Sequence, residues 1–316
     1  MKLRILVAEP EGFSEEARVI ASQAGPVELR SISPSELAEA FDDYDVFWFR
    51  LRFRIEAALI RRSTRRVSVI VCPVTGLDHI DTAACRELGI SVISLKGESE
   101  FLSTVRGTAE LTIGLTLALL RRIPQACSDV REGRWNRDLF RGLEMHSRTV
   151  GIVGVGRLGR LVAGYFRAFG AEVWGFDVAE FSVEGVQRVP TLERLVAGSD
   201  IITVHVILDE STHHLFNAAL FTLFKPGAVL INTSRGGVID SDALVRALEE
   251  KALAGAALDV IENEHRPAES ELITYARLHN NLLITPHIGG STRESFEKTE
   301  VFIARKLVKH VLGVAA

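Results

Sequence analysis

Short apolar runs alternate with longer stretches of helical pattern along almost the whole of this 316-residue chain. Parallel strands need long crossover connections, usually helices, so this alternation predicts βαβ units and parallel sheets. A chain of this length exceeds what one hydrophobic core ordinarily organises, and two domains are expected. The apolar share of 47% and the charged share of 25% are typical of a globular protein. The sequence therefore predicts an α/β fold with two parallel sheets.

The predicted strands fall into two groups. The first group covers residues 3–8, 46–49, 67–71 and 91–94, and the second covers residues 149–153, 172–176, 201–206, 228–232, 256–260 and 282–285. Between the groups, residues 105–120 form a helical pattern that is apolar on every face. Such a helix must be buried, at a domain junction or in a dimer interface. A last helix begins near residue 291 and is expected to return to the first sheet. We therefore expect one domain from residues 1–100 with 291–316 and a second from residues 101–290.

Charge, hydropathy and cysteine usage argue against several classes of protein. A formal net charge of −4 provides no basic footprint for nucleic acid. No apolar run reaches the length of a membrane span, and the N-terminal MKLRILVAEP passes directly into a strand pattern instead of a cleavable signal. Cys72, Cys85 and Cys127 form no CxxC pair, so neither a disulfide framework nor a metal site is indicated. We expect a cytoplasmic protein with no nucleic-acid, membrane or metal partner.

A glycine-rich turn carries the first functional signal. Directly after the apolar run TVGIV the sequence reads GVGRLG, residues 154–159, and a helical pattern follows. In a dinucleotide-binding turn Gly154 permits the sharp bend, Gly156 lets the backbone approach the pyrophosphate, and Gly159 lets the helix pack closely. The helix N-terminus supplies free N–H groups to the phosphates. The predicted cofactor contacts in this turn are Gly154, Gly156, Arg157, Leu158 and Gly159.

An acidic residue completes the motif. Asp177 ends the next predicted strand, 18 residues after Gly159. A carboxylate there accepts hydrogen bonds from the ribose hydroxyls and repels a 2′-phosphate. The following residues, Val178, Ala179 and Glu180, offer no cation for such a phosphate. The sequence predicts NAD as the cofactor and disfavours NADP.

Three later strand ends carry polar residues where open α/β sheets bind their ligands. Arg235 follows the strand in VLINTSRGGVID, and His287 follows the strand in LLITPHIGGST. The stretch AGAALDVIENEH offers Asp259, Glu262 and Glu264. A guanidinium holds a carboxylate through two parallel hydrogen bonds, and a histidine beside a carboxylate suits proton transfer to or from a hydroxyl. Each residue alone has the alternative of being an ordinary turn residue, and Glu262 is the alternative partner for His287.

The motifs of this chain are, in the second half, GVGRLG, NTSRGG, ALDV with its following glutamate, and TPHIGGST, and in the first half VTGLDHID at residues 74–81. Taken as a set, they resemble those of the D-isomer-specific 2-hydroxyacid dehydrogenase family. The resemblance implies two Rossmann-like domains with a cleft between them, as in formate and glycerate dehydrogenases. It implies NAD-dependent hydride transfer between a small anionic D-2-hydroxy acid and its 2-oxo acid, catalysed by Arg235, Glu264 and His287. It also implies a homodimer. The catalytic trio belongs to the second predicted domain, whereas further substrate contacts, Thr75 and Gly76, belong to the first, so domain closure is expected to gate the reaction.

The same resemblance assigns further residues. Asp259 corresponds to an acid that contacts the nicotinamide amide, and Thr233 and Gly289 are counted with the cofactor contacts. Thr75 and Gly76 correspond to a stretch whose backbone N–H groups hold the substrate carboxylate.

The chain also departs from the family pattern. Four departures concern the substrate pocket and its lid: Val74 in place of a usual glycine, Ile207 and His265 in place of usual prolines, and a longer segment at residues 97–110.

The choice of substrate stays open. Arg50, Arg52 and Arg54 recur at period two and share one face if the strand persists. By resemblance to dehydrogenases that use phosphoglycerate, Arg50 is expected to help bind the substrate phosphate, and the spacing makes Arg52 a further candidate substrate contact. An exposed basic edge is the alternative for both. Hydroxypyruvate, glyoxylate and phosphite remain candidate substrates, whereas formate is disfavoured because Glu264 stands where formate dehydrogenases carry glutamine. An NAD-sensing corepressor is the alternative function. The chain ends soon after the last helix, so no regulatory domain is expected.

Overall fold

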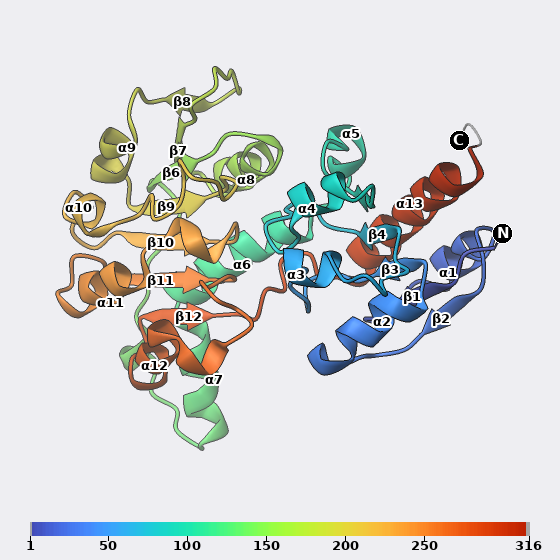
Figure 1. The fold of residues 1–316 in the computed structure, drawn as a ribbon. Helices are drawn as coiled ribbons and strands as arrows, with labels where there is room; N and C mark the ends of the chain where they lie inside the picture. Colours follow the sequence, from blue (N-terminus) through green and yellow to red (C-terminus); the bar gives the residue numbers. More distant parts are fainter. Residues whose placement is uncertain (1, 314–316) are drawn as a thin grey trace. The chain divides into compact units, whose positions relative to one another are not determined.

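The computed structural model describes residues 2–313, which form two compact units (Figure 1). One unit runs to Val105 and resumes at Ser291, and the other is Arg106–Gly290. Each unit is an α/β structure around its own parallel sheet. The predicted fold class, two parallel-sheet α/β domains, is confirmed.

The discontinuous unit contains a five-stranded parallel sheet. Its strand order is β2 (Val27–Leu29), β1 (Ile5–Val7), β3 (Val46–Trp48), β4 (Val69–Cys72) and β5 (Ser91–Ser94). Its helices are α1 (Glu15–Ala21), α2 (Leu37–Asp43), α3 (Ala57–Ile60), α4 (Thr82–Glu87), α5 (Ser99–Leu102) and α13 (Arg293–Leu312), with a 3₁₀ turn at Pro34–Glu36. The edge strand β2 was not predicted from the sequence.

Alternation along the strands divides the core of this unit into two layers. Leu6 packs with Phe41 and Phe47 on one face, while Ile5 and Val7 belong to a second cluster on the other. The second cluster includes apolar side chains of α1 and α13, and Figure 1 shows α13 in red beside α1 in blue. No helix within residues 2–313 combines the length and the apolar character needed to cross a membrane.

The segment at residues 97–110, which the sequence singled out as a departure from the family pattern, is anchored partly on α13. The ring of Phe101 in α5 stacks on that of Phe302 with centroids 4.0 Å apart. Lys306 Nζ donates hydrogen bonds to Glu98 Oε1 at 2.6 Å and to Ser94 O at 2.9 Å. The first part of this segment therefore packs on the helix that returns to the first sheet.

The second unit contains a seven-stranded parallel sheet. Its strand order is β12 (Leu282–Ile284), β11 (Gly255–Leu258), β10 (Val229–Asn232), β9 (Ile201–Val204), β6 (Thr149–Val153), β7 (Glu172–Phe176) and β8 (Val186–Arg188). Its helices are α6 (Gly107–Leu120), α7 (Ile123–Arg131), α8 (Arg157–Ala168), α9 (Leu192–Gly198), α10 (Ala218–Phe221), α11 (Ser241–Glu249) and α12 (Glu271–Leu278), with 3₁₀ turns at Arg137–Phe140, Gly236–Val238 and Pro267–Glu269. The order reverses between β6 and β9, which is the point where such sheets bind ligands.

The apolar helix α6 is buried within the second unit itself. It packs against α8 and against strands β10, β11 and β12. Ile113 and Leu115 belong to the same cluster as Val150 and Ile231 of the sheet. A sheet covered on both faces needs an apolar partner on each, and α6 provides one of them. α6 therefore buries much of its apolar surface within the second unit, while Leu111, Leu117 and Leu119 stay partly exposed.

Candidate active site

The turn between β6 and α8 is shaped by its glycines. Gly154 has φ 91°, and a Cβ there would lie 2.8 Å from the carbonyl of His205. A Cβ on Gly159 would lie 2.1 Å from Gly154 O, so α8 packs directly on the turn. A Cβ on Gly156 would meet no protein atom within 4 Å, so protein packing does not require glycine at this position. The open space beside Gly156 fits the predicted approach of a pyrophosphate to the backbone.

Asp177, directly after β7, is held against this turn. Its Oδ2 accepts a hydrogen bond from Val155 N at 2.7 Å, and its Oδ1 accepts one from Ala179 N at 2.9 Å. Each carboxylate oxygen has a further lone pair for a ribose hydroxyl. A cation that the sequence did not reveal lies nearby: Arg188, on the unpredicted strand β8, is paired with Glu180. The charge of Glu180 balances that arginine.

His205 lies beneath the glycine turn. Its backbone N–H donates to Val153 O at 2.7 Å, and its ring Nε2 lies 2.9 Å from Thr203 Oγ1. Burial of the ring lowers the pKa of His205 to about 3, so the imidazole is neutral at physiological pH.

The turn after β10 presents Arg235. Asn232 is fully buried, and its Oδ1 accepts hydrogen bonds from Ser234 N at 2.9 Å and Ser234 Oγ at 2.7 Å. Its Nδ2 donates to Arg235 O at 3.0 Å, so one amide side chain fixes the turn on both sides. Thr233 Oγ1 lies 2.9 Å from Thr112 Oγ1 of α6. Arg235 is half-buried, and its Nη1 donates to Ser234 O at 2.8 Å.

Asp259 anchors the loop that carries His287. Its Oδ1 accepts hydrogen bonds from Thr285 Oγ1 at 2.6 Å and Ile288 N at 2.8 Å, and its Oδ2 accepts one from Gly289 N at 2.7 Å. Burial raises the pKa of Asp259 above its ordinary value, and these hydrogen bonds oppose that rise. The carboxylate that was predicted to contact nicotinamide therefore also organises the histidine loop.

His287 and Glu264 form a direct pair. The backbone of His287 is left-handed, with φ 53°, and its backbone N–H donates to the backbone carbonyl of Asp259 at 2.8 Å. Its Nδ1 lies 2.7 Å from Glu264 Oε2. With Nδ1 engaged by the carboxylate, Nε2 is the ring nitrogen that remains to exchange a proton with a substrate. Glu262, the alternative carboxylate, lies instead against two other histidines, 3.6 Å from His213 Nε2 and 3.3 Å from His214 Nε2.

The loop after β4 in the other unit contains Thr75 and Gly76. Within residues 2–313 neither backbone N–H donates to a protein acceptor, whereas Val74 N donates to Cys72 O at 2.8 Å. Val74, which replaces a usual family glycine, packs against the core of this unit. Two adjacent N–H groups of this kind are suited to binding an anionic group.

β3 ends at Trp48, before the arginines that the sequence placed on one face if the strand persisted. The backbone N–H groups of Arg50 and Arg52 both donate to Glu9 Oε1, at 2.8 and 3.1 Å. The condition of the period-two argument, a strand that continues through these residues, is therefore not met. Arg52 bonds instead to Ser31 Oγ at 2.7 Å and to Glu11 Oε2 at 3.2 Å.

Arg50 has a set of partners within the protein. Its guanidinium is paired with the buried carboxylate of Glu300, with Nε 3.1 Å from Oε1. Its Nη1 donates to the carbonyls of Glu9 and Glu11, and the group lies 4.1 Å from the ring centroid of Phe296. Burial raises the pKa of Glu300, and Arg50 opposes that rise.

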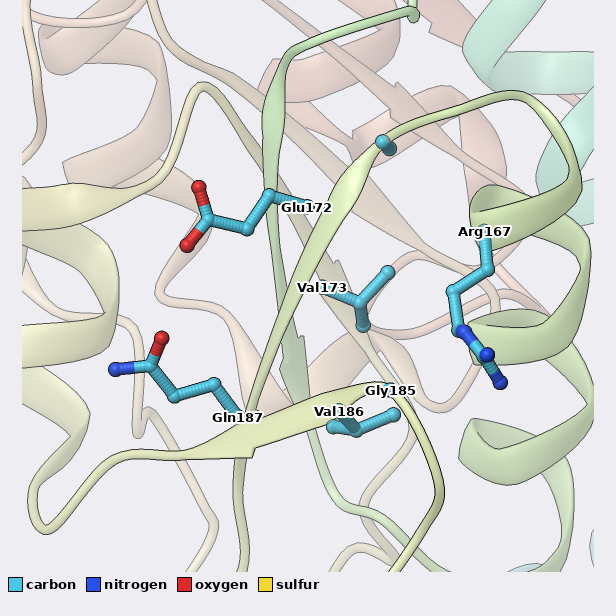
Figure 2. A pocket seen from close by; sticks show the side chains of 7 residues that line it. Arg167, Glu172, Val173, Gly185, Val186 and Gln187 are labelled. Atoms are coloured by element: carbon cyan, nitrogen blue, oxygen red, sulfur yellow. The ribbon is translucent and has the colours of Figure 1, made fainter.

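Figure 2 shows a surface pocket of the second unit. It is lined by Arg167 of α8, by Glu172 and Val173 at the start of β7, and by Val186 and Gln187 of β8. Ligands of open α/β sheets bind at the carboxyl ends of strands, and this pocket lies at the beginning of β7. It contains none of the predicted site residues.

A parallel sheet whose order reverses at a glycine-rich turn, followed by an acid on the next strand, defines a dinucleotide-binding protein. Residues 113–289 match the D-isomer specific 2-hydroxyacid dehydrogenase, NAD binding domain, family. The chain belongs to this family, as the sequence motifs predicted, and the cofactor that its second unit binds is NAD.

Individual relatives agree with this assignment. The D-3-phosphoglycerate dehydrogenase of Methanocaldococcus jannaschii is 35% identical over 99% of this chain and 58% of its own length. The chain thus spans little more than half the length of that relative. The crystal structure of the TT0316 protein from Thermus thermophilus has a TM-score of 0.84 and 31% identity, with 98% of this chain and 97% of that one covered. D-Lactate dehydrogenase from Aquifex aeolicus, complexed with NAD and lactic acid, has a TM-score of 0.84 and 26% identity, with 98% and 96% covered.

Proposed function

We propose that this protein is an NAD-dependent dehydrogenase that interconverts a small anionic D-2-hydroxy acid and its 2-oxo acid. The observation that carries the proposal is the 2.7 Å contact between His287 Nδ1 and Glu264 Oε2, at the strand ends of an NAD-binding sheet. A histidine oriented by a carboxylate is the group that such a reaction needs for its hydroxyl proton.

Each residue of the trio has a distinct task. Arg235 binds the substrate carboxylate and polarises the adjacent carbonyl. His287 Nε2 takes the hydroxyl proton during oxidation and returns it during reduction, while Glu264 fixes the ring and stabilises the imidazolium. NAD, when bound, accepts or donates the hydride. Asp259 holds the loop of His287, and Asn232 holds the turn of Arg235.

We infer that the discontinuous unit binds substrate. The support is the pair of N–H groups at Thr75 and Gly76, which are suited to a carboxylate. A phosphoglycerate-like acid is the favoured substrate, since relatives such as that of M. jannaschii are named D-3-phosphoglycerate dehydrogenase. A substrate phosphate at Arg50 would have to compete with Glu300 for the guanidinium, and at Arg52 with Glu11.

The test is steady-state turnover with NADH on a panel of 2-oxo acids: hydroxypyruvate, glyoxylate, 2-oxoglutarate and phosphorylated acids. We expect NADH oxidation with at least one of them and little activity with NADPH. NAD binding without turnover of any acid in either direction would contradict a dehydrogenase and favour the NAD-sensing corepressor.

We also propose a homodimer. Its support is a row of exposed apolar side chains along residues 123–143, which includes Val130 and Leu139 and in which Trp135 is 87% exposed. Replacing Trp135 with serine is expected to weaken the dimer in sedimentation experiments, whereas replacing the exposed Glu132 with glutamine is not. A wild-type chain that sediments as a monomer at micromolar concentration would contradict the proposal.

We propose a cytoplasmic location, because Cys72, Cys85 and Cys127 are all thiols outside any disulfide, and reducing compartments preserve thiols. Cell fractionation with a compartment-specific thiol label tests it. Recovery of the protein in an oxidising compartment would contradict it.

A further inference from the structure

Three side chains of the second unit converge outside the proposed catalytic trio. His213 and His214 follow β9, and Glu262 follows β11. His213 Nε2 lies 3.6 Å from Glu262 Oε1, and His214 Nε2 lies 3.3 Å from Glu262 Oε2. The two imidazoles stack with ring centroids 4.0 Å apart, so both Nε2 atoms face the same carboxylate. The three potential ligand atoms all lie within 4.8 Å of one another.

The loops that carry these residues are packed together. His214 N donates to Gly237 O at 2.9 Å, which joins the first loop to the turn after β10. A Cβ on Gly236 would lie 1.9 Å from the carbonyl carbon of Ile261, so the loop with Glu262 lies directly on the same turn. The cluster therefore has a backbone framework that is independent of any charge among its side chains.

The donor set determines which ion it suits. Two neutral imidazoles and one carboxylate suit a borderline divalent transition metal ion such as Zn²⁺, whereas Mg²⁺ and Ca²⁺ prefer oxygen ligands. Zinc bonds of roughly 2.0–2.2 Å in tetrahedral geometry place neighbouring ligand atoms roughly 3.3–3.5 Å apart. Each imidazole Nε2 lies at about this distance from one oxygen of Glu262, 3.6 Å from Oε1 for His213 and 3.3 Å from Oε2 for His214, and one ligand atom from each residue lies within 4.8 Å of the other two. The side chains are 52%, 37% and 35% exposed, so an ion can reach them and water can complete its coordination.

We propose that His213, His214 and Glu262 form a binding site for a zinc-class divalent metal ion. Both imidazoles bind through Nε2, with the ring proton on Nδ1, and Glu262 supplies an oxygen. The bound ion ties the loops after β9 and β11 across the turn that carries Arg235, and so acts as a structural clamp on this edge of the sheet. The sequence does not display the site because 48 residues separate His214 from Glu262.

The test is isothermal titration of the full-length chain, freed of metal by chelation, with Zn²⁺ at neutral pH. We expect one Zn²⁺ per chain and no comparable binding of Mg²⁺. Thermal unfolding with Zn²⁺ at a hundredfold excess over its dissociation constant is expected to shift the midpoint upward by roughly 5–10 °C.

Two variants remove ligands with little change of shape. His214→Asn supplies a residue that tolerates the left-handed backbone at this position, where φ is 50°. Glu262→Gln keeps the side-chain length and removes the charge. Each is expected to weaken Zn²⁺ binding by about tenfold or more and, at the same Zn²⁺ concentration, to reduce the thermal shift to about half or less of the wild-type value. Circular dichroism and NAD binding of the metal-free variants report whether they are folded.

Two further histidine variants serve as controls. His265→Asn alters an exposed histidine in the same turn as Glu262, and His287→Gln alters the pair with Glu264. Both are expected to bind Zn²⁺ as the wild type does. Absence of Zn²⁺ binding, unchanged binding in His214→Asn and Glu262→Gln, or an equal loss in either control would overturn the assignment. None of these outcomes depends on dehydrogenase activity.

Discussion

The strand ends of the second unit and the arginine-rich segment of the first are both dense in charge, but they use it differently. After β10, β11 and β12, buried polar groups such as Asn232 and Asp259 hold the backbone, and the functional side chains extend from it. After β3, the guanidinium of Arg50 is itself a structural element, paired with buried Glu300. The same residue types are therefore proposed as reactive groups in one region and serve as internal supports in the other.

This difference shows which kinds of sequence pattern predict a site. Arg235, Glu264 and His287 were selected because each follows a strand in an order tied to a dinucleotide motif. The arginines after β3 were selected on their spacing and on a resemblance to relatives that use phosphoglycerate, and neither reveals a competing carboxylate elsewhere in the chain. Substitutions in the two regions test this contrast directly.

The largest effect is expected from breaking the buried pair in the first unit. Glu300→Gln leaves the charge of Arg50, 12% exposed, without its partner and should lower the free energy of unfolding by about 3–5 kcal/mol. Urea unfolding measures it. Glu297→Gln, on the exposed side of the same helix, should change stability by less than about 0.5 kcal/mol. If Glu300→Gln were as stable as the wild type, the Arg50–Glu300 pair would not support the fold. The proposed difference between the two charged regions would then be wrong.

The second prediction concerns His287, one of the proposed catalytic residues at the strand ends of the second unit. His287→Gln should lower kcat by roughly a hundredfold or more, the usual scale for loss of general acid–base catalysis, without a comparable change in NAD affinity. Stopped-flow kinetics and fluorescence titration measure the two quantities. His279→Gln, at a ring that stacks on Tyr275, is the matched control and should retain activity. A His287→Gln enzyme with near wild-type kcat would remove the histidine from the mechanism.

The third prediction tests whether Glu264 acts through His287. Glu264→Gln should lower kcat by about tenfold, and adding it to His287→Gln should cost almost nothing further, because residues that act as a unit are non-additive. The double-mutant cycle needs kcat for the four enzymes. Glu269→Gln, an exposed acid paired with Arg266, is the control. Additive losses in the double mutant would show that Glu264 acts independently of His287.

Much of the fold was predictable because its central strands are continuous apolar runs between helical segments. The missed strands, β2 and β8, are short edge strands with exposed residues, VEL and VQR, and lack that signal. The turns that present the site residues depend on buried polar groups. Nothing in the sequence distinguishes Asn232 as the side chain that fixes the Arg235 turn.

Long-range pairs were the least predictable part. Arg50 and Glu300 are separated by 250 residues, and only the return of α13 to the first sheet brings them together. His214 and Glu262 meet for a similar reason, since β9 and β11 flank β10. The sequence allows the inference that these strand ends lie at a common edge of the sheet. It does not show which carboxylate pairs with which basic side chain.

The smallest effect is expected at the ribose end of the cofactor site. There a carboxylate proposed to bind a ligand, that of Asp177, lies close in sequence to one that is paired within the protein, that of Glu180. Asp177, the predicted ribose-binding acid, accepts hydrogen bonds from two backbone N–H groups, and Glu180 is paired with Arg188. Asp177→Asn keeps an oxygen acceptor but removes the repulsion of a 2′-phosphate, so the preference of kcat/KM for NADH over NADPH should narrow by about tenfold. Glu180→Gln removes the partner charge of Arg188. It should narrow the preference for NADH over NADPH less than Asp177→Asn does, because the carboxylate of Asp177 remains. Equal use of both cofactors by the wild type would contradict the role of Asp177. A larger shift from Glu180→Gln than from Asp177→Asn would make the Glu180–Arg188 pair, which lies in a region without any motif, the main determinant of cofactor choice.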